Sequence, residues 1–248
     1  MSNAYLIPLA STTLSMRTFW LSLLCLLWVV PQVDAHETPI KFENEIVAFE
    51  QQDKVSPPLS KGLLMVGSST IRLWAKTSST DFAPYPVINR GFGGAITGDI
   101  VKVAHRIATP HRPRVVIYCC GGNDLFYLPM TPEQVFENIK TFVGQMRKED
   151  PQVRFVFLAI LKVPSRLSIT QSTDTLNRLL KKYSEENPGM YFVDHNPLFT
   201  QADGSPRLDL MLDDHLHAND QGYREIVQLI RPVVNQAWSD SAKNLSTP

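Results

Sequence analysis

Five short apolar runs recur along the chain, and segments with helical periodicity separate them. Strands that are apolar along their whole length are typical of a parallel sheet, because helices cover both of its faces and exclude water. The runs occupy residues 63–66, 86–89, 114–118, 154–159 and 190–193. This pattern predicts an α/β fold with a single doubly wound domain, a three-layer α/β/α sandwich around a five-stranded parallel sheet.

The segments between the runs predict the helices of this fold. Apolar side chains recur at helical spacing in residues 42–52, 100–107, 131–147, 172–186 and 221–238. Thr97 is placed to cap the second of these helices, and Thr131 followed by Pro132 is a common beginning of a helix. We expect residues 161–167 (LKVPSRL), which follow the fourth strand, to line a cleft at the strand ends.

The amino terminus predicts export rather than a part of the fold. Residues 19–30 (FWLSLLCLLWVV) are uncharged, Arg17 lies just before them, and a small-residue segment ending at Ala35 follows. These three features are typical of a secretory signal peptide. A buried core helix is the alternative, although its apolar residues would cover every face. We expect a signal peptide at 1–35, with Met16 as an alternative start, and an exported protein, periplasmic or secreted.

The rest of the chain divides into a leading helix and linker at 36–60, the α/β domain at 61–238 and a tail at 239–248. No run of 18 or more apolar residues occurs, so a membrane-spanning helix is not predicted. Lys and Arg number 24 and Asp and Glu also 24, which argues against a nucleic-acid binder because such proteins carry a basic excess. The adjacent Cys119 and Cys120 match neither a disulfide framework nor a zinc site, so we interpret them as small apolar residues of a strand.

Polar residues follow the first three predicted strands at the points where each strand ends. Ser69 lies in the turn Gly67-Ser68-Ser69-Thr70, Gly94 in the segment NRGFGG, and Asn123 in the segment GGND. Because ligands of open parallel sheets bind at the carboxyl ends of the strands, these residues are candidates for a shared site. Each also has a plain structural interpretation, as a helix cap or as a turn residue.

A second cluster, Asp213-Asp214-His215-Leu216-His217, precedes the last predicted helix. If the segment turns helically, Asp214 and His217 lie on one face, and the carboxylate can orient the imidazole toward a nucleophile. A metal site is the alternative, because two histidines and two aspartates occur within five residues. The other histidines show no matching pattern, so no metal is expected.

The order of these elements resembles the SGNH (GDSL-type) hydrolase superfamily, and VGSSTIRLW and NRGFGG are similar to bacterial GDSL-like lipase/acylhydrolase and esterase sequences. The resemblance covers residues 42–238. The first block of that family usually reads Gly-Asp-Ser-Leu, whereas this chain has Ser68 and Thr70 on either side of the nucleophile position, Ser69.

The resemblance implies a flavodoxin-like fold and a serine hydrolase that cleaves carboxylic esters through an acyl-enzyme, without metal or cofactor. It implies Ser69 as nucleophile, His217 as base and Asp214 as its orienting group. An oxyanion hole would comprise the Ser69 N–H, the Gly94 N–H and the Asn123 side chain. Expected substrates are small-molecule or carbohydrate esters, including acetylated groups, and the sequence indicates no oligomeric state. The alternatives are a lysophospholipase or thioesterase, and a non-catalytic binding module.

Overall fold

The computed structural model describes residue 1, residues 41–128 and residues 130–243, and residues 41–243 belong to one compact unit. The predicted signal peptide therefore lies outside the described residues, apart from Met1. Five parallel strands form the sheet: β1 (Leu63–Gly67), β2 (Val87–Gly91), β3 (Val115–Cys119), β4 (Arg154–Leu158) and β5 (Met190–Val193). Their order, β2-β1-β3-β4-β5, is the flavodoxin-like order. The predicted fold is confirmed.

The strands are apolar throughout because each contributes to two cores. Alternate side chains point to opposite faces of a strand, so Leu64 and Val66 join one core while Leu63 and Met65 join the other. The cysteine pair follows the same rule. Cys119 lies in one core and Cys120 in the other, both as free thiols, as predicted for two small apolar residues.

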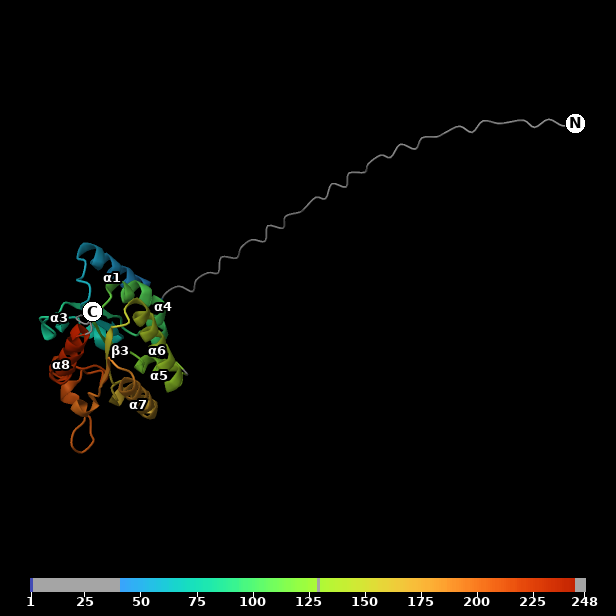
Figure 1. Cartoon of the computed structure of the whole chain (residues 1–248). Helices are drawn as coiled ribbons and strands as arrows, with labels where there is room; N and C mark the ends of the chain where they lie inside the picture. Colours follow the sequence, from blue (N-terminus) through green and yellow to red (C-terminus); the bar gives the residue numbers. More distant parts are fainter. Residues whose placement is uncertain (2–40, 129, 244–248) are drawn as a thin grey trace. The chain divides into compact units, whose positions relative to one another are not determined.

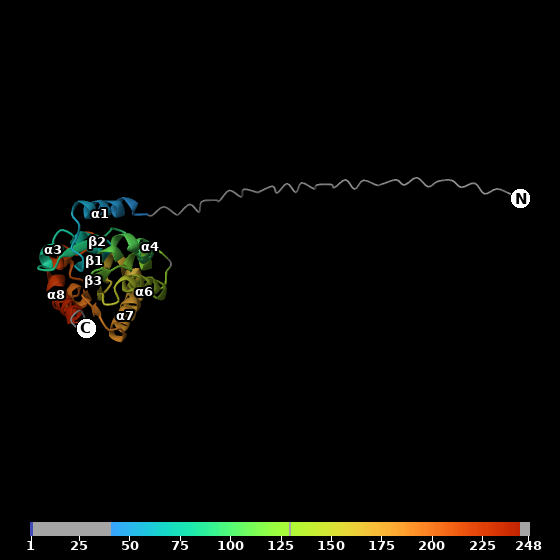
Figure 2. The same ribbon diagram turned by 45° about the horizontal axis from the view of Figure 1, so that its top comes forward.

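Helices cover both faces of the sheet (Figures 1 and 2). The first core is covered by α1 (Glu43–Val55), α4 (Thr97–Ile107), α6 (Pro132–Glu149) and α7 (Thr170–Glu186). The second core is covered by α2 (Ser69–Trp74) and α8 (Asp220–Lys243). Two further short helices are α3 (Ser78–Asp81) and α5 (Gly122–Tyr127), and 3-10 turns cover Thr109–His111, Pro164–Ile169, Asn196–Phe199 and Leu208–Leu210.

The sequence predicts Thr131 and Thr97 as helix caps, and the structure confirms only the first. Thr131 caps α6 as predicted, because its side chain accepts a hydrogen bond from the Gln134 N–H, and the Gln134 side chain accepts one from the Thr131 N–H. The capping role of Thr97 was wrong. Thr97 is the first residue of α4, and its hydroxyl instead donates to the buried Asp124 carboxylate.

The first helix belongs to the same unit as the sheet. Ile46 of α1 and the adjacent Phe42 are buried in the first core. Arg106 of α4 also pairs with Glu43 and Glu50 of α1 at 2.8 and 2.7 Å. None of the helices in the described part of the chain has the length and apolar character of a bilayer-spanning segment.

Candidate active site

Ser69 is placed by a sharp turn between β1 and α2. The turn requires glycine at position 67, since a Cβ there would lie 2.1 Å from the Cys119 carbonyl oxygen and 2.6 Å from the Ile71 side chain. The chain therefore leaves β1 closely packed against β3, and Ser69 opens the short helix that follows. Ser68 makes no side-chain cap of that helix, so the helix-cap interpretation of this segment is not supported.

The second glycine-rich segment lies directly beside this turn. Asn89 of β2 donates to the Ile71 carbonyl oxygen at 2.8 Å and accepts from the Gly91 N–H at 3.0 Å, which ties the end of β2 to α2. Gly94 follows with φ +78°, a backbone conformation that favours glycine, and a Cβ there would meet no other atom. The loop thus leaves open space beside Gly94.

Asn123, in α5 just after β3, contacts the glycine-rich loop that contains Gly94. Asn123 is buried, and its amide donates to the Ala95 carbonyl oxygen at 2.9 Å. One of its two amide protons is therefore used by the loop, and one remains. Asp124, fully buried, accepts hydrogen bonds from the N–H and the hydroxyl of Thr97.

Asp214 and His217 meet, as the sequence predicts, but not on a helix. Residues 212–217 form a closed turn whose ends are joined by an antiparallel bridge between Met211 and Ala218. His215 at the tip has φ +50°. The two side chains therefore meet although the helical turn that the sequence left as a condition does not form.

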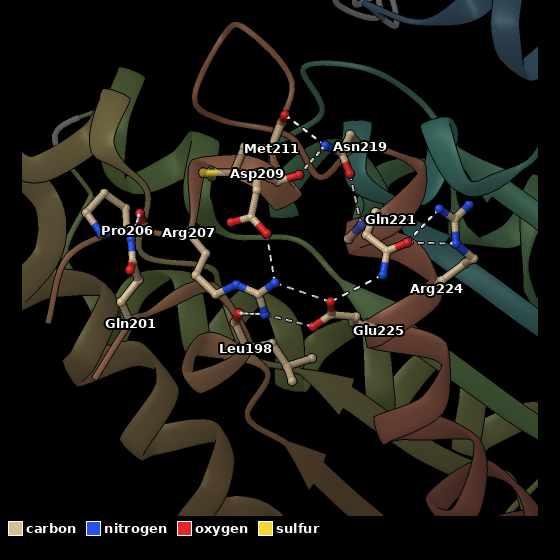
Figure 3. Close-up of polar contacts among 11 residues, drawn as sticks. Leu198, Gln201, Pro206, Arg207, Asp209, Met211, Asn219, Gln221, Arg224 and Glu225 are labelled. Carbon is tan, nitrogen blue, oxygen red and sulfur yellow. Dashed lines mark hydrogen bonds and ion pairs between the residues drawn. The ribbon is translucent and has the colours of Figure 1, made fainter. Parts of the chain in front are cut away.

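A polar network at the base of this turn connects it to α8 (Figure 3). The Asn219 amide donates to the carbonyl oxygens of Asp209 and Met211 at 2.8 and 3.1 Å, and its oxygen accepts from the Gly222 N–H at 3.0 Å. Arg207 beside it pairs with Asp209 at 2.8 Å and with Glu225 of α8 at 3.0 Å. These bonds join the chain segments before and after the turn to each other and to α8.

The turn brings His217 to Ser69 across 148 positions of the chain. His217 Nε2 lies 2.7 Å from Ser69 Oγ, and His217 Nδ1 lies 2.6 Å from Asp214 Oδ2. The other oxygen of Asp214 accepts from the backbone N–H groups of Leu216 and His217 at 2.9 and 3.0 Å. Desolvation raises the pKa of Asp214, but the hydrogen bonds from the His217 ring and these N–H groups outweigh it and lower the pKa to about 2.

Two cavities open on Ser69. The inner pocket, of about 60 Å³, lies between the strand ends and is lined by Ser69, Asn123, His217 and apolar side chains, among them Ile160, Val163, Leu216 and Ile226. The outer cleft, of about 560 Å³, is bounded by Ser69, Arg72, Gly94, Asn123, Tyr127, Arg166 and His217, with Glu45 also lining it. Leu161, Val163 and Arg166 line the inner pocket, which agrees with the prediction for residues 161–167.

The pKa values of two further side chains at the inner pocket, Cys119 and His195, favour their neutral forms. Burial raises the pKa of the Cys119 thiol to about 12 and lowers the pKa of His195, which also lines this pocket, to about 4. Within residues 41–128 and 130–243, no group of three or more His, Cys, Asp and Glu residues is arranged to hold a metal ion.

The sequence match settles the family. Residues 67–225, more than half of the chain, match the family model of the GDSL-like lipase/acylhydrolase family. The chain belongs to that family. Solved structures share the fold: a protein from Bacteroides fragilis superposes with a TM-score of 0.70 at 20% identity, covering 82% of this chain and 99% of that one. A GDSL-like lipase from Bacteroides thetaiotaomicron gives a TM-score of 0.65 at 17% identity, covering 77% and 98%.

Curated relatives of this family member include platelet-activating factor acetylhydrolase IB subunit alpha1 from several mammals. The bovine protein is 26% identical over 155 residues, and the rat protein is 27% identical over 155 residues. The match covers 62% of this chain and 65% of each relative, so the chain spans less than two thirds of their length.

The roles of three residues escaped the sequence interpretation of this GDSL-like chain. Arg72 lies one helical turn after Ser69, Arg166 donates to the Asn123 side-chain oxygen at 2.9 Å, and Asp124 holds the start of α4. The spacing of Arg72 from Ser69 on a short helix was a usable signal. Arg166 was expected only as part of the cleft-lining segment 161–167. Its contact with Asn123 and the contact of Asp124 with Thr97 gave no signal, because the partners lie far apart in the sequence.

Proposed function

We propose that this protein is a serine esterase that works through an acyl-enzyme. The observation that carries the proposal is the continuous contact from Asp214 through His217 to Ser69, at 2.6 and 2.7 Å. With Nδ1–H donating to the ionised Asp214, His217 Nε2 is free to accept the Ser69 proton. Ser69 Oγ then attacks the ester carbonyl, and the protonated His217 returns the proton to the leaving alcohol. A water activated by His217 hydrolyses the acyl-enzyme.

The tetrahedral intermediate would be stabilised by an oxyanion hole. Its donors in this proposal are the backbone N–H groups of Ser69 and Gly94 and the free amide proton of Asn123. The three residues border the outer cleft, which supports the assignment. Loss of one preorganised donor of this kind costs about 3 kcal/mol in the barrier.

The sizes of the cavities favour an ester of a short acyl group. The inner pocket of about 60 Å³ accommodates only a few non-hydrogen atoms beside Ser69. A larger alcohol portion fits the outer cleft of about 560 Å³, from which it can leave to solvent. Small-molecule or carbohydrate esters, such as acetylated sugars, meet both requirements.

A lipid ester is the second candidate, and two observations favour it. The curated relatives are named platelet-activating factor acetylhydrolase. In addition, Tyr127 lines the cleft with 66% of its surface exposed, and Arg166 packs on its ring and on the ring of Phe126, which is 38% exposed. Such an apolar rim suits a substrate with an alkyl chain outside the acyl pocket.

The test is hydrolysis of p-nitrophenyl esters of increasing acyl length by the wild-type protein and by Ser69→Ala. We expect the highest kcat/KM with acetate, a steep fall beyond butyrate and no turnover above background for Ser69→Ala. Residual turnover in a folded Ser69→Ala protein would contradict the covalent mechanism. A rise of kcat/KM with acyl length would favour an enzyme for long-chain acyl esters over a short-acyl esterase.

A further inference from the structure

The outer cleft carries more positive than negative charge around Ser69. Two guanidinium groups, those of Arg72 and Arg166, line it, together with one carboxylate that the proposed chemistry does not use, that of Glu45. The proposed reaction gives Arg72 no role, and it uses Arg166 only through the hydrogen bond to Asn123. The two cations therefore require a separate explanation.

Arg72 lines the cleft, and its side chain has no hydrogen-bond partner among the described residues. It lies on α2 one turn after Ser69, and a Cβ on Gly93 would come within 2.8 Å of its Nε, so its side chain lies against the glycine-rich loop. Its side chain is exposed, and within the described part of the chain its guanidinium makes no hydrogen bond or ion pair. An unpaired guanidinium beside a nucleophile is well suited to bind an anion.

Arg166 reaches the same cleft from the segment after β4. One of its amino groups donates to Asn123 Oδ1 at 2.9 Å. Its guanidinium carbon lies 4.8 Å from the ring centre of Phe126 and 5.3 Å from that of Tyr127. These contacts orient the plane of the guanidinium and leave N–H donors on its other edge. Arg166 can therefore attract an anion together with Arg72 without changing its own conformation.

We propose that the outer cleft binds an anionic group on the alcohol side of the scissile ester, with Arg72 as its main contact and Arg166 as the second cation. The inference rests on the proposed esterase function. The alcohol side is chosen because the inner pocket takes only a short acyl group, whereas the departing alcohol must lie where the cleft opens. Carboxylates and phosphates share the recognising chemistry, and both are included in the test.

The experiment compares three acetate esters that differ in the charge on the leaving group: 3-carbamoylphenyl acetate, 3-carboxyphenyl acetate and 3-acetoxyphenyl phosphate. Each kcat/KM is divided by the rate of alkaline hydrolysis of that ester, which removes differences in intrinsic reactivity. The wild-type protein should prefer an anionic ester over the neutral one. Arg72→Gln should lower that ratio about fivefold or more, the size expected for one partly exposed ion pair. The preference should also decrease with added salt.

Three variants complete the design. Arg72→Lys should keep most of the preference, because it keeps the charge, and Glu45→Gln should increase the preference, because it removes the opposing carboxylate. Arg178→Gln, a matched loss of an exposed arginine on α7 outside both cavities, should leave the ratio as it is. If the wild type shows no preference for either anionic ester, or if Arg72→Gln lowers all three rates equally, the anion subsite is wrong. If Ser69→Ala retains turnover, the proposed function itself has failed, and the two failures are thus distinct.

Discussion

His215 and His217 lie two positions apart, yet their surroundings differ. His217 contacts both Ser69 and Asp214 through its ring. His215 lies at the exposed tip of the turn. Its backbone carbonyl oxygen, rather than its ring, makes a contact, because it accepts from the Ser165 hydroxyl at 3.0 Å. Alternation along the turn thus separates a ring that reaches the site from a ring that faces solvent.

The corresponding prediction compares two alanine substitutions. His217→Ala should reduce kcat/KM for p-nitrophenyl acetate by about 10⁴-fold or more, since the base of a triad is lost. His215→Ala should stay within about threefold of the wild type, since it removes no contact to the site. Thermal melts of both variants serve as the control for folding. A severe loss in His215→Ala with an active His217→Ala would contradict the assignment of the base.

At the scale of elements, the glycine-rich loop depends on a contact between helices. Asp124 on α5 accepts from the Thr97 N–H at 2.9 Å and from its hydroxyl, which joins α5 to the first residue of α4. The loop that contains Gly94 ends at this point. Asp124 is therefore a positioning residue: it lines neither cavity at Ser69, but it sets the place of a proposed oxyanion donor.

We expect Asp124→Ala to lower kcat about tenfold or more while changing KM little, because the loop would hold the transition state less well than the ground state. It should also destabilise the protein by about 1–3 kcal/mol, since the Thr97 N–H would be buried without a partner. Asp124→Asn should restore most of the activity, because its amide oxygen can still accept. Equal changes of kcat and KM in all variants would argue for a purely structural role.

At the scale of the whole molecule, buried histidines couple stability to pH. Burial lowers the pKa of His195 to about 4, and burial, followed by the charge of Arg90, also lowers the pKa of His111. In the unfolded chain a histidine has a pKa of about 6.5. Between these values the unfolded chain binds a proton that the folded chain does not, so stability falls as the pH decreases from about 6.5 to about 4.

His195→Gln should flatten the pH dependence of the unfolding free energy in that range, by at most about 3 kcal/mol for a group shifted by this amount. Part of the slope should remain, because His111 still titrates. His105→Gln provides the control, since His105 is exposed. Urea unfolding at pH 7, 6, 5 and 4 gives the measurement, and an unchanged slope in His195→Gln would contradict the buried neutral histidine.

The sequence alone was sufficient for the five strands and the doubly wound fold, and it singled out Ser69, Asp214 and His217, whose role as a triad stays a prediction. Strand and helix periodicity are local properties, and so are the turn that follows β1 and the three-residue spacing of Asp214 and His217. The tertiary structure decided the rest. It showed that the turn around His215 is not helical, and that Thr97 donates a hydrogen bond to Asp124 rather than capping α4. It also showed that Arg72 and Arg166 line one cleft. The physical reason is that these contacts join segments far apart in the chain, and their geometry depends on how the helices pack on the sheet.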